Sequence, residues 1–225
     1  KDIEKLRNFL NIEKWIIFSG SWGSSLSLAY SQEHPNNILS IVLRGVFLCR
    51  KKEVEWFLHG IKNIFPEYWN RFNSFLPKDE RKNLLLSYYK RLINIDPIIN
   101  GEAAVSWARY EANCSTLLPN ASISEEFVDV QMALNLARIE AHYFLNHLFL
   151  EEGQLLKNIN NIKNIHGDII QGRYDSICPP ESAYELASIW PNANLQIIEK
   201  AGHSSLEAPI QKALLETMTA MKKLF

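Results

Sequence analysis

The sequence WIIFSGSWG, residues 15–23, is the stretch from which the fold of this chain can be worked out. Its first four residues are apolar, as in a buried parallel strand. The residues that follow it, Ser24–Tyr30, are small or apolar at helical spacing. We therefore predict a strand, a tight turn with Ser21 at its apex, and a helix. Gly20 and Gly23 bracket the serine with small residues, which so sharp a turn requires.

A serine on a sharp turn between a strand and a helix is the nucleophile elbow of the α/β-hydrolases. The turn lifts the hydroxyl above the sheet and places it at a helix N-terminus, where developing negative charge is stabilised. The usual pattern is Gly-x-Ser-x-Gly, and Ser19 occupies the position of the first glycine. Serine is also small, so we expect the turn to tolerate it.

The composition of the 225 residues is that of a soluble globular protein, with 47% hydrophobic and 22% charged residues and a net charge of −1. This charge balance favours neither a nucleic-acid partner nor a membrane surface, and no run of 18 apolar residues is present. The cysteines Cys49, Cys114 and Cys178 are odd in number and scattered. That pattern argues against a zinc site or a disulfide framework and favours the cytoplasm.

The order of the elements predicts two parts. Strands are expected at residues 38–43, 164–171 and 194–198, and connections through helices make them parallel to the first strand. The predicted core therefore comprises residues 1–47 and 159–225, and residues 48–158 form an all-helical insertion. The helices expected in the insertion cover residues 53–64, 78–95, 101–118 and 124–150, with Pro66, Pro77, Pro97 and Pro119 between them.

An elbow serine needs a base and an acid that orients the base, and α/β-hydrolases supply them in the chain order Ser, acid, His. Asp175 follows the third predicted strand and His203 follows the fourth. Both residues are thus expected at the carboxyl edge of the sheet, where open α/β sheets bind ligands. We predict that His203 takes the proton of Ser21 and that Asp175 fixes the histidine tautomer.

Several short segments then carry a resemblance to the proline iminopeptidases, serine peptidases of the α/β-hydrolase superfamily, over almost the whole chain. The matching segments are Gly20–Ser24, Leu43–Leu48, Ala137–Glu140, His142–Phe144, Gly172–Asp175 and Ala201–Ser204. A tryptophan after the nucleophile and a helix reading R-I-E-x-H-Y-F are not general features of hydrolases. The chain departs from the family's pattern at Gln171, Tyr110 and Ala141, where the family has His, Trp and Asn.

The resemblance implies a triad of Ser21, Asp175 and His203 under a helical cap, with no metal and no organic cofactor. It implies that the backbone N–H of Trp22 supplies one oxyanion donor. It also implies how the substrate, a small peptide with a free N-terminal proline, is bound. Cap carboxylates that match Glu111 and Glu140 hold the amino terminus, Phe47 packs against the proline ring, and Arg44 helps to neutralise the acidic site.

Members of this family have roughly a further third of a domain before the helix that opens this chain at residues 2–10. That part carries the first strands of the sheet and a His-Gly-Gly-Pro-Gly loop with the second oxyanion donor. The resemblance therefore implies that the N-terminal strands are missing here, and that these 225 residues alone are inactive or poorly stable.

Two alternatives to an N-terminal proline exopeptidase remain at this point. One is another cap-bearing hydrolase, such as an esterase, an amidase or a broader aminopeptidase, for which Glu111 and Glu140 would matter little. The other is a non-catalytic protein of the same fold that acts as a binding module. A complete Ser, Asp and His set argues against the second alternative. No obligatory protein partner is indicated.

Overall fold

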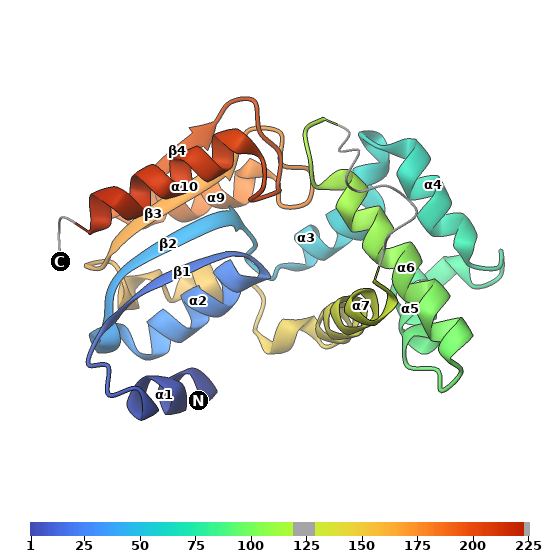
Figure 1. Ribbon diagram of the computed structural model, residues 1–225, viewed down its shortest axis with the longest axis horizontal. Coiled ribbons are helices and arrows are strands. Elements are labelled where there is room, and N and C mark those ends of the chain that lie inside the picture. Colours follow the sequence, from blue (N-terminus) through green and yellow to red (C-terminus); the bar gives the residue numbers. More distant parts are fainter. Residues whose placement is uncertain (119–128, 223–225) are drawn as a thin grey trace. The chain divides into compact units, whose positions relative to one another are not determined.

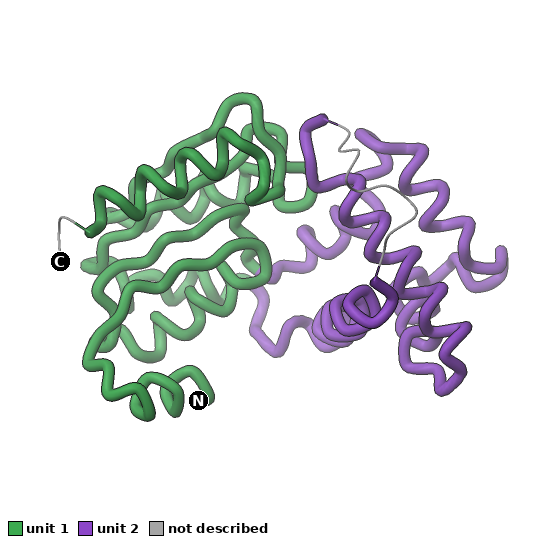
Figure 2. Tube along the Cα trace, in the orientation of Figure 1, with its two compact units in different colours: residues 1–48, 153–225 green, residues 49–152 purple. Residues whose placement is uncertain are grey.

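The computed structural model describes residues 1–118 and 129–222 (Figure 1). The chain divides into two compact units (Figure 2). Unit 1 combines Lys1–Leu48 with Gly153–Phe225, and unit 2 is the continuous segment Cys49–Glu152. The chain thus leaves unit 1, forms unit 2, and returns to complete unit 1.

Unit 1 is built on a parallel sheet, which in the described residues has four strands in the order β1-β2-β3-β4. The strands are β1 (Trp15–Ser21), β2 (Ile38–Val46), β3 (His166–Gly172) and β4 (Ala193–Ile198). All four were predicted from the sequence, and β2 runs three residues further than expected, through Gly45 in a left-handed conformation. This confirms the parallel α/β core.

Helices cover both faces of the sheet (Figure 1). The helix α10 (Ala208–Met221) packs on β3 and β4, while α2 (Trp22–Glu33) packs on β1 and β2 and α9 (Pro180–Ile189) on β2, β3 and β4. Because right-handed crossovers connect strands that are added in one direction, α2 and α9 share one face and α10 takes the other. Val42 and Ile170 belong to the cluster under α10.

The segment that returns from unit 2 packs against the elbow helix. It contains the short helix α8 (Gln154–Lys157), which contacts α2. The buried side chain of Gln32 on α2 donates a hydrogen bond of 2.7 Å from Nε2 to the carbonyl oxygen of Leu155. Residues 153–158 therefore belong to unit 1.

Unit 2 is helical, with no strand among its described residues. Its helices are α3 (Lys51–Glu55), α4 (Pro66–Phe75), α5 (Leu84–Leu92), α6 (Pro97–Cys114) and α7 (Val130–Leu145). Its core is aromatic: the ring of Phe72 stacks on those of Tyr88 and Tyr110, each at a centroid distance of 4.3 Å. Buried Trp107 and Phe57 pack beside them.

Some helix boundaries differ from those predicted. The helix α4 was not predicted, and α6 begins four residues earlier than expected, because Pro66 and Pro97 occupy the first helical turn rather than the loops between helices. The predicted helix at 53–64 is α3 followed by a π-helical turn and a 3-10 turn. Of the predicted helix at 124–150, residues 124–128 lie outside the described residues, as does Pro119.

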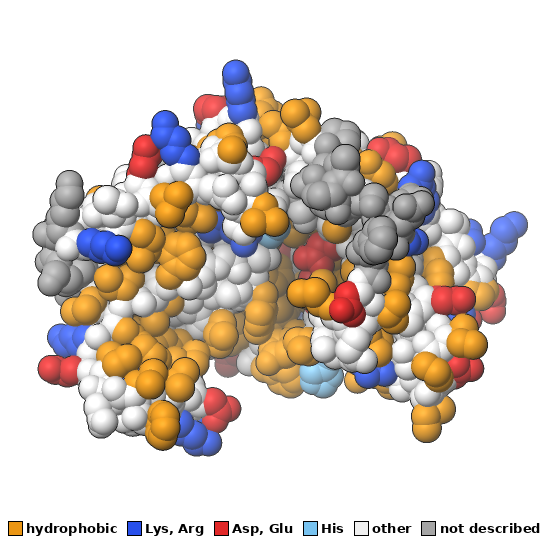
Figure 3. All heavy atoms as spheres, viewed as in Figure 1, with side chains coloured by type: hydrophobic (Ala, Val, Ile, Leu, Met, Phe, Trp, Pro, Cys, Tyr) orange, Lys and Arg blue, Asp and Glu red, His pale blue; other side chains and the backbone are white. Residues whose placement is uncertain are grey.

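Apolar side chains gather on the surface of unit 1 over α1 (Asp2–Phe9) (Figure 3). Phe9 is 82% exposed, and Leu6 and Leu10 are about half exposed. Phe18, on the strand β1, is exposed to a similar extent. In the described part of the chain, every helix is too short or too polar to cross a membrane.

Candidate active site

Ser21 ends β1 at a strained turn directly before α2. Its backbone angles are φ 57° and ψ −129°, a conformation that residues other than glycine rarely adopt. Such strain persists where the surrounding structure requires it, as at a nucleophile elbow. Trp22 is the first residue of α2, so its N–H lies at the helix N-terminus, where the helix dipole favours negative charge.

The serine that replaces the first glycine of the elbow pattern has a structural partner. The hydroxyl of Ser19 lies 2.7 Å from that of Ser27 on the following helix, so the side chain binds β1 to α2. The hydroxyl of Ser24 donates to the carbonyl oxygen of Ser21 at 2.6 Å. The structure thus accommodates the Ser19 side chain between β1 and α2.

Two serines of α2 fix the backbone of Phe47, the residue directly after β2. The Phe47 N–H donates to Ser24 Oγ at 3.0 Å, and Ser25 Oγ donates to the Phe47 carbonyl oxygen at 2.6 Å. The Phe47 side chain is buried. The predicted proline-ring contact is thus on a segment bonded to the elbow helix.

The imidazole of His203 lies between Ser21 and Asp175. His203 Nε2 is 3.0 Å from Ser21 Oγ, and Nδ1 is 2.8 Å from Asp175 Oδ2. Asp175 and His203 are both buried, at 3% and 6% exposure. An aspartate acceptor at Nδ1 selects the tautomer with its proton on that nitrogen, which leaves Nε2 able to accept the proton of Ser21.

The loop that carries Asp175 holds the carboxylate with backbone amides. Asp175 Oδ1 accepts hydrogen bonds from the N–H groups of Ile177 and Cys178, at 3.1 and 2.8 Å. Such bonds fix the direction of the carboxylate. The other oxygen, Oδ2, is thereby directed toward the imidazole.

Gly45 lets β2 pass close to this pair of side chains. Its φ is +55°, and a Cβ at this position would lie 2.9 Å from His203 Cε1 and 3.3 Å from Asp175 Oδ2. Any larger residue would therefore meet the imidazole and also strain the backbone. This glycine is a requirement of the site that the sequence did not indicate.

Arg44 contacts the same histidine. Its Nη1 donates to the His203 carbonyl oxygen at 2.9 Å and lies 3.1 Å from His203 Nε2. Burial lowers the pKa of Arg44, and the negative charge of Asp175 partly counteracts that shift. The sequence placed Arg44 in the acidic site of the family, whereas its contact with the proposed base was not expected.

Glu111 and Glu140 belong to unit 2, on α6 and α7, and their side chains lie close enough for the charge of one to act on the other. The buried indole of Trp107 donates from Nε1 to Glu140 Oε2 at 2.6 Å. Burial raises the pKa of Glu140 well above its usual range, and the charge of Glu111 raises it further. Two carboxylates held this close favour a cation between them.

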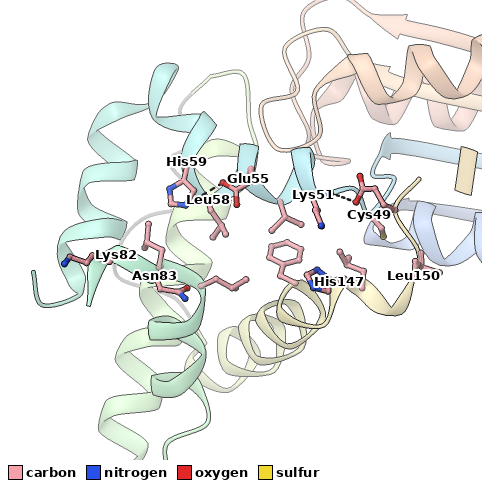
Figure 4. A pocket seen from close by; sticks show the side chains of 15 residues that line it. Cys49, Lys51, Glu55, Leu58, His59, Lys82, Asn83, His147 and Leu150 are labelled. Atoms are coloured by element: carbon pink, nitrogen blue, oxygen red, sulfur yellow. Dashed lines mark hydrogen bonds and ion pairs between the residues drawn. The ribbon is translucent and has the colours of Figure 1, made fainter. Parts of the chain in front are cut away.

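A cavity of about 610 Å³ lies within unit 2 (Figure 4). Its wall includes Cys49, Leu58, Phe144 and Leu148, and Lys51, His59 and Lys82 add polar groups. Neither Glu111 nor Glu140 lines it. The predicted carboxylate pair is thus separate from this cavity.

The described residues hold no group of three or more His, Cys, Asp or Glu side chains that could bind a metal ion. Cys49, Cys114 and Cys178 are buried thiols, and no disulfide joins them in the described structure. Burial raises the pKa of Cys114 to about 12, so this thiol stays protonated at neutral pH.

Comparison with known proteins identifies the family. Residues 1–208 match the model of the alpha/beta hydrolase fold. A probable proline iminopeptidase of Leptolyngbya boryana is 45% identical over 96% of this chain and 68% of its own length. The proline iminopeptidase of Arabidopsis thaliana is 44% identical over 99% of this chain and 60% of its own length. The chain therefore spans about two thirds of the length of these relatives.

The solved structures support the fold. An alpha/beta fold family hydrolase from Bacillus anthracis superposes with a TM-score of 0.59 at 22% identity, over 94% of this chain and 69% of that one. The parallel sheet, the strained serine at the end of β1 and the family match agree with one another. The chain belongs to the proline iminopeptidase family of α/β-hydrolases.

Proposed function

We propose that this protein is a serine exopeptidase that releases N-terminal proline from small peptides through an acyl-enzyme intermediate. The observation that carries the proposal is the hydrogen-bonded series from Ser21 Oγ through the His203 ring to Asp175 Oδ2, with distances of 3.0 and 2.8 Å. The names of the relatives at 45% and 44% identity support the choice of substrate.

In the proposed reaction Ser21 Oγ attacks the carbonyl carbon of the N-terminal residue while His203 Nε2 takes the hydroxyl proton. The N–H of Trp22 stabilises the oxyanion that forms. His203 then gives its proton to the departing amine, and the acyl-enzyme remains on Ser21. Water attacks the ester with His203 again as base, which releases the free amino acid.

The carboxylates of Glu111 and Glu140 are proposed to bind the ammonium of the substrate. Transfer of an ammonium from water into a partly buried site is costly unless anions pair with it. The carboxylates of Glu111 on α6 and Glu140 on α7 lie near each other, so together they can pair with the ammonium. An N-acylated peptide has no ammonium and leaves the two carboxylates to repel each other.

The proposed cap role of unit 2 has the same basis, since unit 2 carries both side chains. Arg44 and Phe47, both in unit 1, are proposed as further substrate-binding residues, Arg44 through its positive charge and Phe47 through contact with the proline ring.

A cytoplasmic location is proposed because Cys49, Cys114 and Cys178 are buried thiols that no disulfide joins in the described structure. Disulfides form in oxidising compartments and are rare in the cytoplasm.

The experiment that tests the proposal compares two arylamides of proline on the full natural protein. One has a free amino terminus and its twin is N-acetylated. Turnover of the free form only, abolished in Ser21→Ala, is the expected result. Glu140→Gln should raise KM for the free form, whereas Glu102→Gln, at an exposed glutamate of α6, should leave it unchanged.

Equal turnover of the two arylamides would contradict the aminopeptidase assignment and favour an esterase or amidase. Turnover of neither, by a folded protein, would favour a binding module.

A further inference from the structure

Gln171 is a fully buried polar residue next to the proposed triad. It is the last but one residue of β3, and its side chain is 0% exposed. A buried amide is costly unless its donors and acceptor are satisfied. Here the cost is offset by three hydrogen bonds, and each of them reaches a different backbone segment or side chain of the site.

The three partners also determine how the amide is oriented. Gln171 Oε1 accepts from the N–H of Val46 at 2.9 Å, and Nε2 donates to the carbonyl oxygen of Cys178 at 2.9 Å. A backbone N–H can only donate and a carbonyl can only accept, so the oxygen and nitrogen of the amide cannot be exchanged. The remaining N–H of Nε2 donates to Asp175 Oδ2 at 3.0 Å.

The oxygen that Gln171 contacts is the one that orients the proposed base. Asp175 Oδ2 accepts from Gln171 Nε2 and from His203 Nδ1, whereas Oδ1 accepts from the two backbone amides of its own loop. The position of Oδ2 is therefore defined by one side chain besides the histidine itself.

Gln171 further connects the acid to the strand beside the nucleophile. Val46 is the residue of β2 paired with Ser21, just after a shift in the register between β1 and β2. Backbone pairing between β2 and β3 ends at Arg44 and Ile170. Beyond these residues the Gln171 side chain connects the two strands, because its Oε1 accepts the hydrogen bond of the Val46 N–H. One amide thus connects the end of β2, the Asp175 carboxylate and the Cys178 backbone.

We infer that Gln171 is a positioning residue of the hydrolytic site: it fixes Asp175 Oδ2 under His203 and sets the geometry in which His203 accepts the proton of Ser21. The inference deepens the proposed function and rests on it. Gln171 touches neither Ser21 nor the ammonium-binding carboxylates in any described contact. Its loss therefore acts on kcat and leaves KM nearly unchanged.

The test replaces Gln171 in the full natural protein and measures kcat and KM separately with the free proline arylamide. Gln171→Leu keeps the approximate size and removes all three hydrogen bonds; kcat should fall by roughly one to two orders of magnitude with KM within about twofold. Gln171→Glu replaces the donor by an acceptor beside Asp175 and should cost more. Gln171→His retains an N–H donor and should recover most of the activity.

The matched control is Gln32→Leu. Gln32 is a buried glutamine of the same unit whose Nε2 donates to a backbone carbonyl. The Gln32→Leu variant should be less stable than the natural protein, without a comparable loss of kcat. Folding of each variant is checked by circular dichroism and thermal unfolding. Equal losses of kcat in Gln32→Leu and Gln171→Leu would overturn the inference, because they would show a general effect of a lost buried bond.

Ser21→Ala, measured in parallel, separates this inference from the proposed function. Turnover that survives Ser21→Ala would overturn both. If Ser21→Ala is inactive while folded Gln171→Leu has the kcat of the natural protein, only the positioning role of Gln171 is refuted.

Discussion

The Asp175 carboxylate accepts four hydrogen bonds in the described structure. Two come from backbone amides, one from the Gln171 amide and one from the imidazole of His203. Asp175→Asn would place an NH₂ group either opposite His203 Nδ1 or opposite the N–H groups of Ile177 and Cys178, where only an acceptor fits. We expect kcat to fall by about 10⁴-fold, since the wrong histidine tautomer is then favoured. Steady-state kinetics measure this directly, and a loss below tenfold would contradict the assigned role of Asp175.

Glu140 is expected to make the stability of the folded protein depend on pH. Burial and the neighbouring Glu111 raise the pKa of Glu140 in the folded protein, while the indole of Trp107 lowers it in part. A folded-state pKa above the unfolded value means that the folded protein retains this proton longer as pH rises. The ionised form is then the destabilised one, so Glu140 reduces stability above the ordinary carboxyl pKa.

Glu140→Gln should therefore raise the free energy of unfolding at pH 8 by about 1 kcal/mol, since a neutral amide removes the repulsion. The gain should vanish below about pH 4, where both states of the natural protein hold the proton. Urea unfolding of both proteins across this range measures it. A variant that is less stable at pH 8 would show that the carboxylate is stabilising. The same ionisation predicts that KM of the natural protein rises on acidification.

The elbow pattern, the chain order and the family resemblance led to the proposed nucleophile, acid and base, each expected at the carboxyl end of a strand of a parallel sheet. The contacts of Arg44, Gln171 and Trp107 could not be predicted in this way. Arg44 and His203 are 159 positions apart, and their contact depends on how β2 and the loop after β4 pack. No local pattern in the sequence records such a distance.

At the level of the helices and strands, prolines account for the largest differences between the predicted and the observed helix boundaries. Pro66 and Pro97 were interpreted as breaks, and each lies in the first turn of a helix. Proline is favoured there because its missing N–H has no partner in that turn anyway. The cap at Asp96, which accepts from the N–H of Ile98 at 2.9 Å, is the signal that would have placed the start of α6 correctly.

The end of α7 could not be predicted either. Three successive residues, His147 to Phe149, have φ between 51° and 56°. None of them is a glycine or an asparagine, which are the usual signals of a left-handed turn. Tertiary packing imposes this conformation, since Leu148 is 4% exposed.

Gly172, at the end of β3, controls how the loop after β4 approaches the sheet. A Cβ at Gly172 would lie 2.0 Å from the Gly202 carbonyl oxygen and 2.8 Å from that of Ala201. Both are backbone atoms of the loop that carries His203, so they can move only with the loop. Gly172→Ala should lower the free energy of unfolding by about 3 kcal/mol and also reduce kcat.

The matched control for this loop is Gly153→Ala. Its backbone is left-handed, at φ 72°, whereas that of Gly172 is not, and a Cβ at Gly153 would meet no atom closer than 3.9 Å. It should cost about 1 kcal/mol and leave kcat unchanged. Thermal unfolding and kinetics compare the two variants; similar costs for both would refute the steric argument.

For the whole molecule, the division into units follows from continuity of the chain. Unit 2 is one uninterrupted segment, Cys49–Glu152, with its own core of stacked aromatic rings. Unit 1 needs two separate segments to complete its sheet. The helical insertion was visible in the sequence because strand patterns stop after β2 and resume only at β3.

We expect residues 49–152, produced alone, to fold as a helical domain with a cooperative thermal transition. Circular dichroism should show helical minima, and near-ultraviolet signals should report the packed tryptophan and tyrosine rings. Helical minima without a cooperative transition or near-ultraviolet signal would indicate that unit 2 depends on unit 1 for its packing.

Covalent labelling of the full natural protein with a fluorophosphonate, followed by mass spectrometry, tests directly whether His203 activates Ser21. The reagent reacts with a serine that a neighbouring base has activated. One adduct is expected, located on Ser21, that is absent in Ser21→Ala and strongly reduced in His203→Ala. Labelling of another residue, or undiminished labelling in folded His203→Ala, would contradict the activation of Ser21 by His203.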